Sequence, residues 1–261
     1  METPVAVKPK IAFFDFTSCE GCQLTVVDSL ADHIELLSVV EIVQFREAMS
    51  ERGEDYQIAF IEGSCTRPSD EPRLKAIREQ ADIVVALGAC AHLGGINSIR
   101  NRQPLQDVRA YVYGEEAELF ETYPARPISA VIDVDVSIPG CPINPREFVQ
   151  TVKMLLQGRQ PEPPDYPLCI ECKSLENVCV YLRGKTCLGP ITRAGCDAIC
   201  PAYGDGCEGC RGIISNPNYE AMKAVLDWHG LDMAEVEAKT TMFLTYQTMN
   251  MDEKKENGHG H

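Results

Sequence analysis

Cysteine constrains this sequence more than any other residue type. The chain of 261 residues contains thirteen cysteines and only five histidines. Four thiolates are the ligand set of one cubane iron–sulfur cluster, and three such sets favour an electron-transfer protein with several clusters. The spacing sorts twelve of the cysteines into three groups of four and leaves Cys65 over; the groups are Cys19, Cys22, Cys90 and Cys141, then Cys169, Cys172, Cys179 and Cys187, then Cys196, Cys200, Cys207 and Cys210.

The charge balance is strongly acidic. Lys and Arg number 24 and Asp and Glu number 39, which gives a formal net charge of −15. Nucleic acid as a partner is therefore excluded, because its phosphates require a basic face. The apolar run 83–91 is among the longest and falls short of the roughly 18–20 residues that a membrane span needs.

The first ten residues lack a basic region followed by an apolar one, so we predict a cytoplasmic protein without a membrane span. Disulfides are rare in that compartment. The cysteines are therefore interpreted as metal ligands rather than as a disulfide framework.

Alternating β and α patterns occupy the first 160 residues and predict a doubly wound α/β domain with a parallel sheet. Strands are predicted at 10–16, 57–61, 82–87 and 131–138, and helices at 23–34 and 71–80. The first and third runs are almost entirely apolar, as expected for strands buried on both faces. A further helix is predicted to begin at Pro145, with Asn144 as its cap and Glu147 as the capping-box acid, and to end at Gly158.

Each cysteine of the first group follows one of these predicted strands. Cys19 and Cys22 follow the run 10–16, Cys90 follows 82–87, and Cys141 follows 131–138. The carboxyl ends of parallel strands meet at one edge of a sheet, where ligands bind. We therefore expect these four thiols to lie together, although Cys19-Glu20-Gly21-Cys22 on its own could also be a redox dithiol.

Eight cysteines lie within 42 residues after a proline-rich linker at 160–167. Two zinc sites are an alternative interpretation of this block, because zinc also takes four thiolates. We predict a sheet domain over 1–160, an irregular two-cluster domain over 161–215 held by its metals, helices over 216–250 and a disordered tail over 251–261.

Several motifs resemble those of the nickel–iron hydrogenase small subunit. They are Cys19-Glu20-Gly21-Cys22, Ile61-Glu62-Gly63, Gly88-Ala89-Cys90 through Gly95, Pro139-Gly140-Cys141-Pro142, Cys187-Leu188-Gly189-Pro190 and Cys207-Glu208-Gly209-Cys210. The resemblance extends over roughly residues 10–230 and is stronger to the soluble cytoplasmic enzymes than to the exported ones. It implies a flavodoxin-like sheet domain, and electron transfer between a nickel–iron centre on a large subunit and a further redox subunit.

The resemblance also implies a ligand set for each of three 4Fe–4S clusters. Cys19, Cys22, Cys90 and Cys141 match the proximal quartet; Cys196, Cys200, Cys207 and Cys210 match the medial quartet; Cys169, Cys172, Cys179 and Cys187 match the distal quartet. Cys169 stands where the exported enzymes use histidine. Because replacing Cys by His raises the potential of Rieske centres, an all-thiolate distal cluster implies a lower potential. Such a potential suits an acceptor subunit linked to pyridine nucleotide, ferredoxin or heterodisulfide reductase.

Three further residues, Glu20, Glu62 and Cys65, lie outside the proposed ligand sets. Glu20 and Glu62 lie beside the proximal motifs and are candidates for a proton relay or, alternatively, for solvated or capping carboxylates. Cys65 is predicted to be a buried, inert thiol, with involvement near the proximal cluster as the alternative.

Two other functions remain open at this point. The first domain also resembles a subunit of NADH:quinone oxidoreductase, a family that has adjacent cysteines at its cluster and generally lacks the eight-cysteine block. A zinc-stabilised interaction module is the third hypothesis. The sequence has no recognisable flavin site, so we expect the final acceptor to bind to another subunit.

Overall fold

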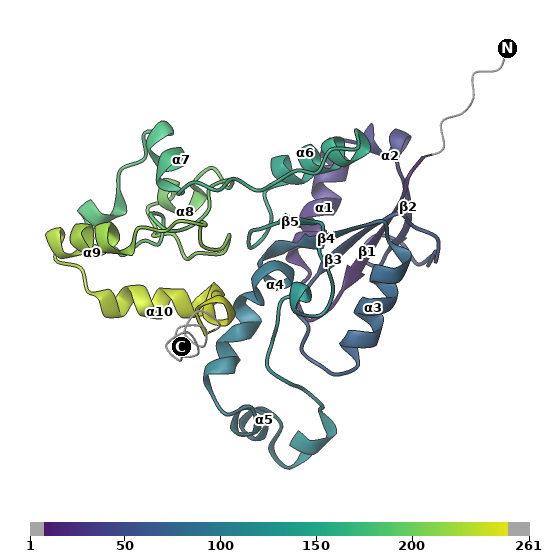
Figure 1. Cartoon of the computed structure of the whole chain (residues 1–261), viewed down its shortest axis with the longest axis horizontal. Helices are drawn as coiled ribbons and strands as arrows, with labels where there is room; N and C mark the ends of the chain where they lie inside the picture. Colours follow the sequence, from purple (N-terminus) through teal and green to yellow (C-terminus); the bar gives the residue numbers. More distant parts are fainter. Residues whose placement is uncertain (1–7, 250–261) are drawn as a thin grey trace, which may run out of the picture.

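The structure, a computed structural model, describes residues 8–249 and contains an all-parallel sheet of five strands (Figure 1). Its order, β2-β1-β3-β4-β5, is that of the flavodoxin-like fold and confirms the predicted α/β class. The strands are β1 (Lys10–Asp15), β2 (Glu41–Phe45), β3 (Ile58–Glu62), β4 (Ile83–Leu87) and β5 (Val136–Ile138).

Helices cover both faces of this sheet. Phe13 packs on one face with residues of α1 (Gly21–Asp32) and α6 (Pro145–Leu156). Ala12 and Phe14, its neighbours in β1, point to the opposite face, which α3 (Asp70–Gln80) covers. The alternation follows from the two-residue period of a strand, and burial on both faces accounts for the apolar runs in the sequence.

The predicted strands differ from the observed ones in two places. Strand β2 was missed because it lies at the sheet edge, where the polar residues Glu41 and Gln44 interrupt the apolar pattern. The run 131–138 forms a strand only at its last three residues. Before them the Asp135 side chain accepts a hydrogen bond from the Val84 amide at 2.8 Å, so a carboxylate takes the place of a backbone carbonyl in the ladder.

The predicted helix cap at Asn144 is confirmed, whereas the capping-box acid is not. The Asn144 side chain accepts a hydrogen bond from the Arg146 amide at 2.9 Å. Glu147 does not reach back to the cap, because both of its oxygens bind the guanidinium of Arg211, 64 residues further along the chain.

A projecting segment follows β4 and α4 (Gly88–Leu93). It contains η1 (Gly95–Arg102), α5 (Leu105–Tyr113) and η2 (Gly114–Leu119), and η3 (Ile128–Ala130) leads back toward the sheet. Residues 104–121, which we call the arm, extend away from the sheet (Figure 1). No residue of α5 is buried.

The C-terminal part is irregular, with short helices, and lies beside the sheet (Figure 1). Its helices are α7 (Cys169–Ser174), η4 (Val180–Arg183), α8 (Ile199–Ala202), α9 (Tyr219–Trp228) and α10 (Met233–Phe243). One further short helix, α2 (Leu36–Val39), belongs to the sheet domain and lies between α1 and β2. The cysteine-rich segment was expected to have little core of its own. Leu188 and Ile191 of this segment are nevertheless buried in one cluster with Leu226 of α9 and with Leu244, which follows α10.

The predicted boundaries after residues 160, 215 and 250 stay predictions, and the tail 251–261 lies outside the described residues. None of the helices that the structure describes is long and apolar enough to cross a membrane.

Candidate iron–sulfur sites

The proximal quartet gathers at the carboxyl edge of the sheet, as predicted. Cys19 and Cys22 lie at the start of α1 after β1, Cys90 lies in α4 after β4, and Cys141 follows β5. The pKa of the Cys90 thiol is raised to about 12, first by burial and then by the charges of the neighbouring Cys141 and Cys19. Cys19 and Cys141 are exposed and Cys22 is buried, so the group opens to the surface on one side.

Glycine keeps the space beside these sulfur atoms open. A Cβ on Gly88 would come closer than 3.0 Å to Sγ of Cys22, and a Cβ on Gly95 would meet the backbone of Cys90 at 2.8 Å. Both glycines have positive φ, 83° and 52°. The backbone at Ile143 and Ile96 acts to lower the pKa of Cys22 and Cys90 respectively, against the effect of burial, which is the direction that stabilises a thiolate.

Glu62 holds the helix that carries Cys22. Its carboxylate is 2 % exposed and accepts hydrogen bonds from the amides of Cys22 at 3.1 Å and Gln23 at 2.9 Å. Burial raises the pKa of Glu62, although the two amides act in the opposite direction. This contact supports the capping alternative for Glu62.

Glu20 lies directly before α1 with a left-handed backbone, at φ 63°. Burial raises its pKa most, and the negative charge of Glu47 acts in the same direction. The proton-relay role suggested for Glu20 and Glu62 stays a prediction.

We predict that Glu62→Ala lowers the free energy of unfolding by about 2–4 kcal/mol, because two buried amides lose their acceptor. Glu62→Gln keeps one acceptor and is expected to cost less. The folded-state pKa of Glu62 is raised, so the wild type binds more protons folded than unfolded and loses stability as the pH rises upward from about 4.5. The Gln variant lacks that pH dependence. Urea unfolding between pH 4 and 7 tests both points, and equal stability of wild type and Glu62→Ala would contradict them.

The distal quartet forms around α7, which begins at Cys169 and contains Cys172. Burial raises the pKa of Cys169 to about 12, and the charges of Cys187, Cys172 and Cys179 follow in that order. A Cβ on Gly189 would lie 3.2 Å from Sγ of Cys187 and 3.4 Å from Sγ of Cys169, so one glycine borders both sulfurs. The Gly189 amide also donates to the Cys187 sulfur at 3.4 Å. Cys179 is exposed.

The medial quartet is more enclosed. The pKa of Cys210 is raised to about 12, mostly by burial. The charge of Cys196 raises it next, and the charges of Cys141 and Cys200 contribute less. Cys207 is buried, and burial raises its pKa, followed by the charge of Cys187 and then that of Cys210. None of the four medial cysteines is exposed.

Neighbouring cysteines connect the medial quartet to the other two. The backbone and the charge of Cys141, a proximal residue, both act on the pKa of Cys210, so the two residues lie close together. The Cys207 amide donates to the sulfur of Cys187, a distal residue, at 3.1 Å. Spacing alone left the pairing of the eight clustered cysteines open, with an interleaved pairing as the alternative, and the grouping that the resemblance implied stays a prediction.

Arg211 was missed in the sequence, where its only signal was its place directly after Cys210. The side chain is 1 % exposed and binds Glu147 of α6 through two hydrogen bonds of 2.7 Å. It also donates to the carbonyls of Pro139 and Ala194, both at 2.6 Å. Arg211 therefore joins the medial segment to the strand end that precedes Cys141.

Cys65 lies apart from all three quartets. It is completely buried, and its Sγ lies 2.7 Å from the hydroxyl of Tyr123. Burial raises the pKa of its thiol, with no cysteine among the contributing neighbours. These contacts agree with a buried, inert thiol.

The residues of each quartet fit a 4Fe–4S cluster. Every group supplies four thiols, and backbone amides donate to their sulfurs, for example Gly209 to Cys207 at 3.4 Å.

Comparison with known proteins agrees with this picture. Residues 19–155 match the family described as NADH ubiquinone oxidoreductase, 20 Kd subunit. The chain is 34% identical to Sulfhydrogenase 2 subunit delta of Pyrococcus furiosus over 219 residues, covering 83% of this chain and 92% of that protein.

Two solved structures share the fold. A subunit of an NAD+-reducing [NiFe]-hydrogenase in the H2-reduced state aligns with a TM-score of 0.55 and 27% identity, over 60% of this chain and 96% of that one. A chain of the [NiFeSe] hydrogenase from Desulfovibrio vulgaris Hildenborough aligns with a TM-score of 0.55 over 84% of this chain and 96% of its own; at 21% identity it supports the fold alone.

The parallel sheet, the cysteines at its strand ends and these matches define the iron–sulfur, electron-transfer subunit of an oxidoreductase. Within that class, the chain belongs to the family of nickel–iron hydrogenase small subunits.

Proposed function

We propose that the chain conducts electrons between the nickel–iron centre of a large subunit and a redox partner subunit, through three 4Fe–4S clusters. The order of the three quartets carries this proposal, since Cys141 lies close to Cys210 and Cys207 contacts Cys187. The proposed ligands are Cys19, Cys22, Cys90 and Cys141 (proximal), Cys196, Cys200, Cys207 and Cys210 (medial), and Cys169, Cys172, Cys179 and Cys187 (distal).

The exposure of the cysteines also supports conduction from one end of the series of quartets to the other. Cys19 and Cys141 are exposed in the proximal quartet, and Cys179 is exposed in the distal one. The medial quartet has no exposed cysteine. A conducting chain needs access for partners at its two ends and insulation from water between them.

The protein would hold the clusters and set their electrostatic surroundings. Bound clusters would supply one-electron transfer. The chain's thiolates would ligate the iron, amides such as those of Gly189 and Cys207 would donate to ligand sulfurs, and the core around Leu188 and Ile191 would exclude water.

The distal quartet supports a low-potential acceptor. All four of its proposed ligands are cysteines, including Cys169, and thiolate ligands favour lower potentials than histidine. We therefore propose an acceptor subunit with flavin or iron–sulfur groups, linked to NAD(P), ferredoxin or heterodisulfide reductase, and a cytoplasmic location.

A second candidate is a subunit of an NADH:quinone oxidoreductase-type complex. The family match over residues 19–155 favours it, because this segment holds the whole proximal quartet. The eight cysteines beyond residue 155 lie outside that match, whereas the sulfhydrogenase relative aligns with 83% of the chain. Hydrogen-dependent reduction of a dye by the purified complex would distinguish the two candidates.

Metal analysis of the natively purified complex tests the proposal. We expect about twelve iron and twelve sulfide per chain, on the count of four per cubane, with nickel on a larger partner. Cys90→Ala, Cys200→Ala and Cys172→Ala should each remove up to about four iron, one cluster each. Cys65→Ala is the matched control and should retain all of them. Two or three zinc ions without sulfide would instead support the zinc-stabilised module.

A further inference from the structure

A cationic cavity lies between the sheet edge and the arm. It has a volume of about 530 Å³ and is bordered by residues that follow β1 and β3 and by residues of η1 and the arm. Four arginines line it, Arg67, Arg73, Arg100 and Arg109, against two carboxylates, Asp15 and Glu121. In a chain with a net charge of −15, four guanidinium groups around one cavity are unexpected.

Carboxylates of the chain satisfy part of this charge. Arg67 binds Asp70 at 3.1 Å. Arg73 lies 3.7 Å from Asp15, which also binds Arg46 at 2.8 Å.

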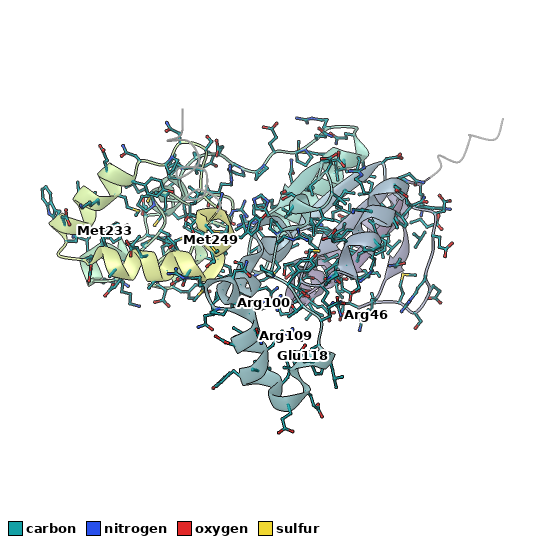
Figure 2. All side chains as sticks on the ribbon, turned by 60° about the horizontal axis from the view of Figure 1, so that its bottom comes forward. Arg46, Arg100, Arg109, Glu118, Met233 and Met249 are labelled. Atoms are coloured by element: carbon teal, nitrogen blue, oxygen red, sulfur yellow. The ribbon has the colours of Figure 1, made fainter. Side chains whose placement is uncertain are left out.

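The arginines nearer the arm are less well paired. Figure 2 shows Arg100 at the base of the arm and Arg109 and Glu118 further along it. Arg109 lies 3.8 Å from Glu118, whose side chain is 84% exposed. Arg100 has no carboxylate within 4.0 Å in the part of the chain that the structure describes, and its Nη2 donates to the Tyr123 carbonyl at 2.8 Å. The Nε atoms of Arg100 and Arg109 are buried without an acceptor. Among the described residues Arg100 therefore lacks a counter-charge, and the counter-charge of Arg109 is exposed to water, so this side of the cavity suits an incoming carboxylate.

The arm exposes apolar side chains around the same cavity. Tyr111 is 92% exposed, Leu119 77% and Val112 61%. Tyr113 and Phe120 stack with ring centroids 4.0 Å apart, and both border the cavity. A helix of nine residues without a buried side chain gains little from packing, so we infer that a partner covers it.

The cavity also adjoins the exposed side of the proximal quartet. Thr17 lines it and lies two residues before Cys19. The Asn97 side chain of η1 donates to the Thr17 carbonyl at 2.8 Å, which ties the base of the arm to this loop. A subunit that brings its redox centre to exposed Cys19 would therefore also reach the cavity.

We propose that the cavity receives an acidic segment of the large subunit, with a carboxylate bound by Arg100 and Arg109 and apolar residues covering the arm. The identity of the partner rests on the proposed function. The acidic chemistry rests on the lack of a carboxylate beside Arg100 among the described residues, on the exposed counter-charge of Arg109 and on the four arginines of the cavity.

Photo-crosslinking in the purified complex tests which chain occupies the cavity. A benzophenone amino acid in place of Phe120 should crosslink to the large subunit, in a peptide that contains Asp or Glu. Crosslinks to the acceptor subunit would overturn the proposal. So would crosslinks confined to this chain, or a small molecule found bound there by native mass spectrometry.

Charge reversal tests the chemistry. Arg100→Glu and Arg109→Glu should weaken association with the large subunit about tenfold or more and reduce its salt dependence. Arg52→Glu, at an exposed arginine outside the cavity, is the matched control and should bind as the wild type does. Arg100→Gln is the variant to use if Arg100→Glu does not fold, with a smaller loss expected. Wild-type affinity in the Arg100 variants would overturn the proposal. Iron and sulfide content, measured separately, reports failure of the proposed function itself.

Discussion

Arg211→Met is expected to lower the free energy of unfolding by about 3–5 kcal/mol, because it leaves Glu147 without its counter-charge in a largely buried place. The substitution also removes the donors to the carbonyls of Pro139 and Ala194. The matched control is Arg146→Met, which breaks an ion pair with Asp197 whose side chains are 79% and 46% exposed. That change is expected to cost about 0–1 kcal/mol. Urea unfolding of the purified complex measures both, and equal losses in the two variants would contradict the prediction.

The same pair is expected to influence the medial quartet, which borders it. Arg211→Met removes a positive charge beside Cys196 and Cys210 and should lower the medial reduction potential, whereas Glu147→Gln removes a negative charge and should raise it. The shifts should be on the order of tens of millivolts, and Arg211→Met/Glu147→Gln should largely cancel them. Redox titration followed by electron paramagnetic resonance measures them. Shifts of the same sign in both single variants would indicate structural damage instead of an electrostatic effect.

Gly88→Ala is expected to abolish iron binding by the proximal quartet, a loss of about four iron per chain. The new Cβ would collide with Sγ of Cys22, and the backbone at φ 83° is unfavourable for alanine. Gly158→Ala is the matched control, because Gly158 has φ 70° and nothing within 4 Å of its added Cβ.

The control variant should lose about 1–2 kcal/mol of stability from the backbone alone and keep all its iron. The difference between the two variants therefore isolates the collision with Cys22. Iron analysis and the low-temperature spectrum of the reduced complex provide the measurement, and full iron content in Gly88→Ala would contradict the prediction.

The sheet and the proximal quartet could be predicted because their signals are local. Strand β4 and the interior of β1 are apolar, and cysteines follow both strands within a few residues. Parallel strands bring their carboxyl ends to one edge, so Cys19 and Cys141 had to approach each other although they are 122 positions apart. Strand β2 escaped the pattern because an edge strand does not need to be apolar on both faces.

Other features depend on contacts between distant segments. Glu147 was predicted to cap its own helix, because the helix start is the nearest partner in the sequence. In the structure the guanidinium of Arg211 binds both of its oxygens instead. The arm could not be recognised in the sequence, because its apolar residues follow the pattern of an ordinary amphipathic helix. Only the structure shows that no other part of the described chain buries them.

The sequence by itself therefore determined the fold class, the strand ends that carry the proximal cysteines, and the number of thiols available. Only the tertiary structure decided the Arg211–Glu147 pair and the cationic cavity under the arm. The physical reason is that strand periodicity and turn chemistry act over a few neighbouring residues, whereas hydrogen bonds and ion pairs form between whichever groups the packed chain brings together.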